Sequence, residues 1–241
     1  MSGFGLGRIA IVCAVAATNA VAQNAAPPDQ LNELARRSVG VVSVVQSRPL
    51  DELSHNIGFG YGVTGAYEFQ VDRAGFLLLR AGASYLEYGH ETKHVPLSPT
   101  IGGRIQVNVS TENSIFPATL GAELTWPRGR VRPYVNANVG GLFFATTSSI
   151  DTYSDDDDFS TTNQQDFTWS RVFGGGLYIP VSTDRNGDHL SIDIGFQKFM
   201  TGHASYLRPG SIQDLPTGTV ITPLESDTHM LLVHIGVRYG R

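Results

Sequence analysis

The chain contains almost no cysteine and no long apolar run. Its one cysteine, Cys13, lies within the first 22 residues, so the rest of the chain has no disulfide and no thiol chemistry. Beyond residue 22 there is no stretch of 18 or more apolar residues, which argues against a helical membrane protein. The charge balance is acidic, with 17 Lys and Arg against 22 Asp and Glu, and this argues against a nucleic-acid-binding protein.

Motifs for catalysis and metal binding are also missing. The sequence has no Gly-x-Ser-x-Gly elbow, no His-Glu-x-x-His, no phosphate-binding loop and no cysteine pair. The run Asp155–Asp158 lies among Ser and Thr and indicates a solvated loop, with binding of calcium or a bridge to lipopolysaccharide as the alternative. Segment 184–188 contains Asn186-Gly187, which is typical of a hairpin turn. We predict that the protein is not an enzyme and has no catalytic, cofactor-binding or metal-binding residue.

The first residues form an export signal. Arg8 precedes the apolar run 9–17, and Ala20-Val21-Ala22 has the small-x-small pattern of a signal-peptidase site. We therefore predict a signal peptide over residues 1–22 and export through the Sec pathway. Residues 23–37 are polar at first and contain proline, and we interpret them as a short periplasmic lead-in.

The last part of the chain, 228–239, alternates strictly between two kinds of residue. Successive side chains of a strand point to opposite faces, so one face here is apolar and the other is largely small or polar. The apolar face consists of Leu231, Val233, Ile235, Val237 and Tyr239. The opposite face carries Met230, Leu232, His234, Gly236 and Arg238. Such a strand fits a barrel with lipid outside and a polar lumen inside.

The same alternation recurs in most of the other apolar segments. We predict eight strands, at 39–46, 57–69, 75–88, 115–126, 131–145, 167–179, 189–199 and 228–239. The first alternates poorly, and the sixth is ambiguous around Gly174-Gly175-Gly176, where a bulge or a close approach would explain the glycines. On the second strand, Ile57 begins the outward face. The predicted fold is all-β, an eight-stranded antiparallel transmembrane β-barrel over residues 38–241.

The connections between these strands supply an independent test. They alternate between short segments, at 69–75, 127–130 and 181–188, and long segments, at 88–115, 146–166 and 200–227. Outer-membrane barrels have short periplasmic turns and longer extracellular loops, so both termini are expected in the periplasm. Segment 104–109 also has strand character. We assign it to an extracellular excursion, and a ten-stranded barrel is the alternative.

Seven ionisable residues fall on the predicted inward faces. They are Glu68, Arg80, Glu123, Arg132, Asp193, His234 and Arg238. A charge in a narrow lumen needs a partner or water, and neighbouring strands supply opposite signs. We predict a polar network that closes the lumen, with Glu123 held between Arg80 and Arg132. A gated ion path through the same residues is the alternative.

Taken together, the leader, the eight amphipathic strands and the aromatic-containing last strand resemble the small outer-membrane β-barrel proteins of Gram-negative bacteria, the OmpA/OmpX-like class. The last strand departs from that class, because Tyr239 is followed by Gly240-Arg241. The resemblance implies a monomer in the cell outer membrane. Its expected partners are outer-membrane lipid and lipopolysaccharide, and the barrel assembly machinery during biogenesis. The fold alone does not give a function. The three long connections are rich in Ser, Thr, Asp and Gly and no catalytic motif is present, so we predict a structural or surface-interaction role, with a narrow pore as the alternative.

One loop suggests a different activity. His203 and Ser205 lie just beyond the seventh strand, with Glu225 later in the same loop. This arrangement resembles that of outer-membrane lipid A deacylases, which makes a lipid-modifying enzyme a further alternative. Near the strand ends stand Tyr67, Tyr85, Trp126 and Tyr239, which we interpret as anchors at the membrane–water interface.

Overall fold

The computed structural model describes residues 38–96, 106–151, 159–183, 189–208, 211–215 and 218–240. The predicted signal peptide 1–22 and lead-in 23–37 lie outside these residues, as do the acidic run Asp155–Asp158 and the turn segment 184–188. Among the described residues, no helix has the length and apolar character needed to cross a membrane.

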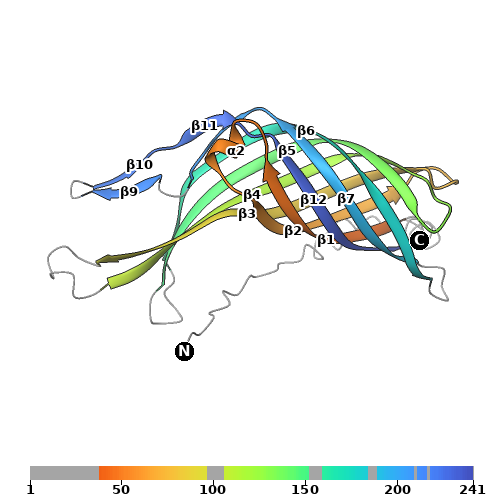
Figure 1. The fold of residues 1–241 in the computed structure, drawn as a ribbon, viewed down its shortest axis with the longest axis horizontal. Helices are drawn as coiled ribbons and strands as arrows, with labels where there is room; N and C mark the ends of the chain where they lie inside the picture. The colour runs from red at the N-terminus through yellow and green to blue at the C-terminus, as the bar shows by residue number, and fades with distance from the viewer. Residues whose placement is uncertain are drawn as a thin grey trace, which may run out of the picture. The chain divides into compact units, whose positions relative to one another are not determined.

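Eight antiparallel strands close into a barrel (Figure 1). In chain order these are β1 Ser38–Pro49, β2 Gly60–Gln70, β3 Leu77–Pro96, β4 Gln106–Thr125, β5 Arg132–Asp151, β6 Phe159–Thr183, β7 His189–Thr201 and β12 Met230–Gly240. β1 pairs with both β2 and β12, so the sheet has no free edge. The predicted eight-stranded barrel is confirmed. Residues 106–109 of the segment with strand character belong to the long β4, where they extend the β3–β4 hairpin and add no strand to the barrel.

Short elements gather at the end of the barrel that carries the long connections. A single helical turn, α2 Leu53–Asn56, follows β1. Two hairpins lie between β7 and β12 in the chain: β8 His203–Tyr206 pairs with β11 Leu224–Asp227, and β9 Ile212–Leu215 pairs with β10 Gly218–Ile221. In the described part of the chain, the elements added to the barrel wall therefore lie at the same end of the barrel (Figure 1).

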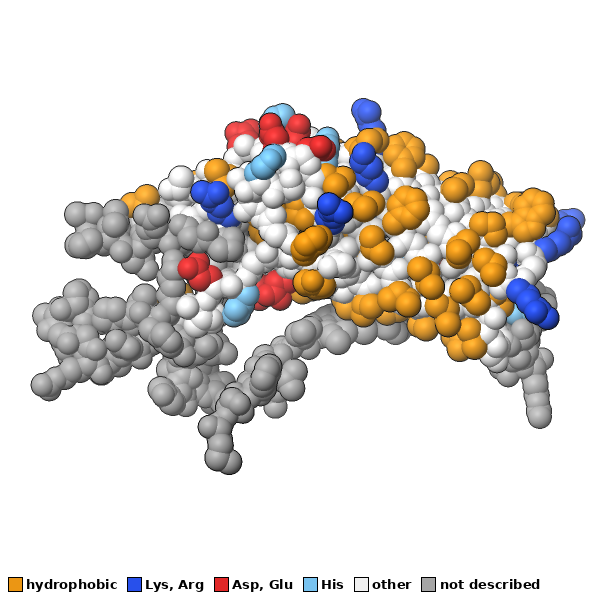
Figure 2. Space-filling view, viewed as in Figure 1, with side chains coloured by type: hydrophobic (Ala, Val, Ile, Leu, Met, Phe, Trp, Pro, Cys, Tyr) orange, Lys and Arg blue, Asp and Glu red, His pale blue; other side chains and the backbone are white. Residues whose placement is uncertain are grey.

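The outer wall is a belt of exposed apolar side chains. Val44, Leu120, Val139 and Ile235 are each more than half exposed, and many other large apolar residues share this face (Figure 2). β1 and β12 have 12 and 11 residues, which matches the roughly 9–11 residues that cross a bilayer when tilted. β1 alternates cleanly in the structure, and its alternation was hidden in the sequence because valine occurs on both faces.

One predicted outward residue is buried. Ile57 is 7% exposed and packs with Leu53 of α2 in an apolar cluster, since β2 begins only at Gly60. The prediction placed Ile57 outward because it lies an even number of residues from Phe59 and Tyr61, so all three would share one face of a strand. Even spacing fixes the face only within a strand. Before Gly60 the chain is not part of β2, and it turns inward over the end of the barrel.

The interior consists of two halves. At the end of the barrel where β1 begins and β12 ends, the interior is polar and charged, with Glu68, Arg80, Glu123 and Asp193 all buried. Toward α2 and β8 it is an apolar cluster of side chains from the barrel wall and from the covering segments. The cluster contains Val45, Leu53, Ile57, Leu86, Tyr88, Ile115, Leu142, Phe144, Val172, Phe199, Ala204, Tyr206, Met230 and Leu232. The buried ionisable residues of the predicted inner face are thus found in one half of the barrel, and the other half buries polar residues such as Asn113 and Thr146 beside its apolar cluster.

Candidate functional site in the barrel lumen

Glu68 lies at the centre of the charged half of the lumen. Its carboxylate is fully buried and forms ion pairs with two arginines. Arg80 Nη1 contacts Glu68 Oε1, and Arg238 Nε lies 3.0 Å from Glu68 Oε2. Arg80 Nη1 also lies 3.3 Å from Glu123 Oε2, so Arg80 bridges the two glutamates. Two acids and two bases therefore balance one another within a single cluster, which burial of charge requires.

Tyr178 of β6 ties the two glutamates together. Its hydroxyl donates to Glu123 Oε1 at 2.7 Å and lies 3.3 Å from Glu68 Oε1. The guanidinium carbon of Arg238 stands 4.5 Å from the centre of the Tyr178 ring, an arrangement that adds a cation–π attraction. Tyr178 was not among the predicted network residues. The sequence left the faces of the sixth strand ambiguous because of the glycines before Tyr178, and the structure places this side chain inside the barrel.

A second polar cluster adjoins the first. The Tyr134 hydroxyl donates to Asp193 Oδ1 at 2.8 Å and lies 3.2 Å from His234 Nε2. His234 Nε2 is itself 3.3 Å from Asp193 Oδ2. The rings of Tyr134 and Tyr178 stack with their centres 4.2 Å apart and their planes at 13°. The two tyrosines therefore join the Glu68–Arg80–Glu123–Arg238 cluster to the Asp193–His234 pair.

Two glycines make room for Tyr134. A Cβ atom on Gly176 would lie 2.6 Å from the Tyr134 hydroxyl oxygen, and one on Gly195 would lie 2.3 Å from it. Neither distance is possible for a real side chain, so the tyrosine can cross the lumen only where β6 and β7 carry glycine. A close approach explains Gly174-Gly175-Gly176, because the register shifts of β6 fall elsewhere: between Thr162 and Gln164 in its pairing with β5, and between Pro180 and Ser182 in its pairing with β7.

Six of the seven predicted lumen residues are brought together, and Arg132 is not. Arg132 lies opposite Tyr178 in the β5–β6 register and is partly exposed. Within the described part of the chain it forms no ion pair with Glu123, and its Nε has no hydrogen-bond partner. The expected position of Glu123 between Arg80 and Arg132 therefore does not match the structure. Arg238 from the last strand supplies the second positive charge of the cluster, on Glu68.

The loop residues of the deacylase alternative come together only in part. His203 Nδ1 lies 3.1 Å from Asp227 Oδ1, so its acidic partner is Asp227 and not the expected Glu225. Glu225 lies opposite Ser205 in the β8–β11 register. The Ser205 hydroxyl accepts a hydrogen bond from Gln164 at 3.3 Å, and among the described residues it has no hydrogen bond to His203. The base-to-nucleophile contact of a hydrolase is therefore not formed.

Comparison with known proteins gives structural likenesses only. No protein-family model matches the chain, and no curated protein sequence matches it. The Neisserial surface protein A is similar at 12% identity, over 85% of this chain and 97% of that chain, with a TM-score of 0.44. Ail, the attachment invasion locus protein of Yersinia pestis, is similar at 11% identity, over 86% and 99%, with a TM-score of 0.42.

The N-terminal β-barrel domain of Pseudomonas aeruginosa OprF is similar at 14% identity, over 84% and 98% of the two chains, with a TM-score of 0.33. Likeness of this degree carries no function to the chain. The eight-stranded architecture rests on the strand register itself, and with it the resemblance to small outer-membrane barrels is confirmed at the level of the fold.

Proposed function

We propose that the protein is an integral outer-membrane β-barrel with a closed lumen and a structural or surface-interaction role. The observation that carries this proposal is the belt of exposed apolar side chains around a barrel without a free edge. A soluble protein seldom exposes so large an apolar surface. In lipid, a closed barrel satisfies every strand hydrogen bond internally, and the belt meets the acyl chains.

Access to lipid-soluble quenchers tests the membrane location. The part of the chain after residue 22 has no cysteine, so single labels can be placed at Val233→Cys and Ile194→Cys. Both side chains are about half exposed on the outer wall. Quenchers held in the bilayer core should reach both labels and should not reach a control label at Arg128→Cys in the β4–β5 connection. Labels at Val233 and Ile194 that respond only to water-soluble quenchers would contradict the proposal.

The closed lumen is supported by the two halves of the interior. The charged cluster crosses one half, and the apolar cluster fills the other, since Leu86, Leu142 and Phe199 are at most 1% exposed. Eight strands enclose a space that side chains can fill. Purified protein in a planar bilayer should give no steady conductance. A steady conductance would favour the narrow pore instead.

A lipid-modifying enzyme is the second candidate. The observation that favours it is the contact between Asp227 and His203, the histidine that lies two residues before Ser205. Lipid A or phospholipid mixed with the purified barrel and followed by mass spectrometry separates the two functions. Unchanged lipid supports the non-enzymatic role. Loss of an acyl chain that disappears in Ser205→Ala would establish the enzyme.

A further inference from the structure

Three cations lie on the outer wall among apolar side chains. Arg48, Arg171 and Lys198 are all exposed and point away from the lumen. Arg48 lies opposite Leu231, and Leu231 lies opposite Lys198 on the next strand. Lys198 lies opposite Phe173, two residues from Arg171 on β6. Neighbouring strands are about 4.8 Å apart, so the three cations follow one another across four strands within a narrow band.

These cations have no acidic partner in the described part of the chain, where none of them forms an ion pair. A charge on the lipid face costs free energy that grows with depth in the bilayer, so it belongs near the interface. All three lie toward the end that bears α2 and β8. Figure 2 shows lysine and arginine side chains on this face between the apolar belt and the end rich in acids and histidine.

A groove adjoins the cations. It has a volume of about 780 Å³, and its lining includes Trp169, Arg171, Met200, His203 and His229. The groove thus combines an aromatic and an aliphatic surface with one arginine and two histidines. His229 Nδ1 accepts a hydrogen bond from the Thr201 amide at 3.1 Å, which leaves its Nε2 for a ligand.

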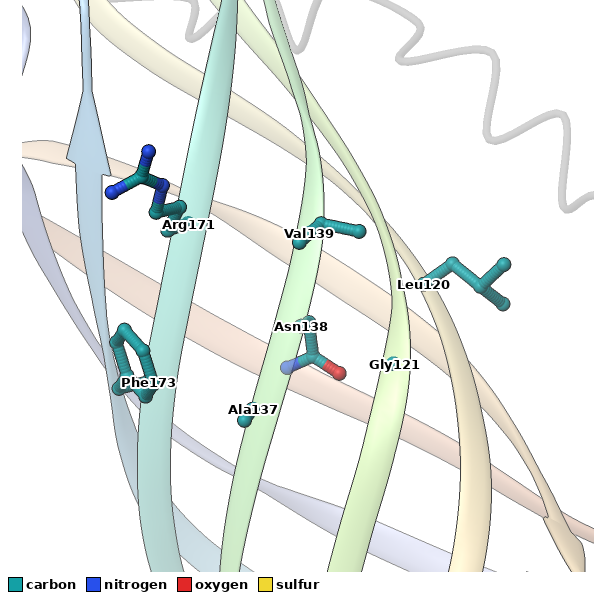
Figure 3. A pocket seen from close by; sticks show the side chains of 7 residues that line it. All are labelled: Leu120, Gly121, Ala137, Asn138, Val139, Arg171 and Phe173. Atoms are coloured by element: carbon teal, nitrogen blue, oxygen red, sulfur yellow. The ribbon is translucent and has the colours of Figure 1, made fainter.

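An apolar crevice of about 230 Å³ lies next to Arg171 on the same wall. Leu120, Ala137, Val139 and Phe173 line it, and Figure 3 shows Arg171 and Phe173 on one side with Leu120 on the other. Arg171 lines both the groove and the crevice, so one ligand could place a charged group in the first and a hydrocarbon chain in the second.

We propose that the wall from β4 to β7 binds lipid A, with the phosphorylated disaccharide at the groove beside β6 and β7 and an acyl chain in the crevice that β4, β5 and β6 form. This inference rests on the proposed outer-membrane location and names the lipid that the barrel holds there. Lipid A carries two phosphates on a broad headgroup, which suits cations spread over several strands better than a single phosphodiester does. Guanidinium groups bind phosphate through paired hydrogen bonds, and the aliphatic and aromatic lining accepts the acyl chain.

Binding of defined lipids to the detergent-solubilised, refolded barrel tests the site. The parent is compared with Arg171→Gln/Lys198→Gln and with the control Arg128→Gln/Arg130→Gln, which removes two exposed arginines from the β4–β5 connection. Native mass spectrometry measures the bound fraction of lipid A, of dephosphorylated lipid A and of phosphatidylglycerol. The Arg171/Lys198 variant should bind lipid A about 25-fold more weakly, since each of the two basic residues near an anionic headgroup contributes about a factor of 5. The control should bind like the parent.

Three outcomes would overturn the inference: equal binding of lipid A by parent and Arg171/Lys198 variant, equal binding of dephosphorylated lipid A by the parent, or binding of phosphatidylglycerol as tight as that of lipid A. The last would identify a phospholipid as the occupant. The two lipid comparisons use the parent alone, so they decide the matter even if a variant fails to fold. A barrel that enters neither micelles nor bilayers would instead contradict the proposed function.

Discussion

Glu68 is the carboxylate on which the charge balance of the lumen depends. Among the described carboxylates, it alone forms ion pairs with both Arg80 and Arg238, and its side chain is fully buried. We expect Glu68→Gln to lower the free energy of unfolding by about 3–5 kcal/mol, because two buried arginines then share the single charge of Glu123. The urea midpoint of the refolded barrel, followed by gel mobility without boiling, measures the change.

The matched control for this prediction is Glu123→Gln. Glu123 is equally buried but forms an ion pair with Arg80 only, so its loss should cost less than the loss of Glu68. The double variant Glu68→Gln/Arg238→Gln should recover part of the stability, because the orphaned guanidinium is removed with its partner. If Glu123→Gln lowers the urea midpoint more than Glu68→Gln does, the cluster is centred on Glu123.

The second prediction at this scale concerns the Tyr134 hydroxyl. Tyr134→Phe keeps the ring that stacks on Tyr178 but removes the donor to Asp193 and the contact with His234. A hydrogen bond to a charged group contributes about 1.5–3 kcal/mol, so the unfolding free energy should fall by that amount. Tyr61→Phe is the control, because Tyr61 is 62% exposed and its bond with Gln46 lies on the outer wall. Equal urea midpoints for Tyr134→Phe and the parent would contradict the prediction.

The sequence places side chains on a face but does not choose their partners. The alternation in the sequence predicted that Glu68, Arg80, Glu123 and Arg238 face the barrel lumen, and the structure places all four there. Which arginine meets which glutamate depends on strand register, and closure of the barrel brings β12 to β1 across nearly the whole chain. The closeness of Arg132 to Glu123 in the sequence suggested Arg132 as the second arginine of the cluster. In the closed barrel, Arg238 takes that role. Such a contact is set by the whole barrel and leaves no local pattern.

At the scale of elements, the β2–β3 connection is held by one carboxylate. Asp72 accepts hydrogen bonds from the amides of Phe76 at 3.1 Å and Leu77 at 2.8 Å. These bonds, that of Leu77 first, lower the pKa of Asp72 below its ordinary value of 3.8. Gly75 in the same turn has φ of 81°, a backbone conformation that glycine adopts without strain.

A pH dependence of stability follows from this turn. A carboxylate with a lowered pKa in the folded state stabilises that state above its unfolded pKa, and the contribution is lost as the pH falls through the folded value. Asp72→Asn should therefore lower the urea midpoint at pH 7. The difference between parent and variant should shrink below about pH 4 and vanish once Asp72 is protonated in both states. A difference that stays constant from pH 7 to pH 3 would show that the charge has no part in the turn.

The covering elements were the least predictable part of the fold. α2 spans one turn, too short for a periodic pattern, and its contribution comes from Leu53 and the adjacent Ile57, both buried in the apolar cluster. β8 similarly adds Ala204 and Tyr206 to that cluster. β8 lies in a connection that the sequence shows only as long, and α2 lies between the first two predicted strands, where no element was predicted. What they cover depends on the barrel mouth, so their roles follow from the fold and not from the local sequence.

At the scale of the whole molecule, the barrel interior changes character along its length. Alternation in the sequence predicts which residues point inward, and it treats Arg238 and Leu232 alike because both have the same parity. The structure shows that Leu232 belongs to the apolar half and Arg238 to the charged half. Strand number and closure could thus be predicted from the sequence. The separation of the lumen into two halves could not, because it depends on the height of each residue in a sheared, closed sheet.

This separation predicts which half excludes ions. Water and ions enter the charged half more readily than a packed apolar layer, so the apolar cluster should be the main barrier. Leu142 and Phe199 are at most 1% exposed within that layer. Leu142→Ala/Phe199→Ala should therefore open a measurable conductance in a planar bilayer, with a loss of about 2–5 kcal/mol in stability for each truncation.

The control for the open lumen is Ile194→Ala/Val233→Ala, which truncates two side chains of the outer wall. Lipid fills the space that these truncations leave, so this variant should give no conductance in the planar bilayer. Glu68→Gln should lower stability without conductance, because the apolar layer above it remains complete. Conductance in Glu68→Gln, with none in Leu142→Ala/Phe199→Ala, would show that the salt-bridged half is the barrier and that the apolar half admits ions.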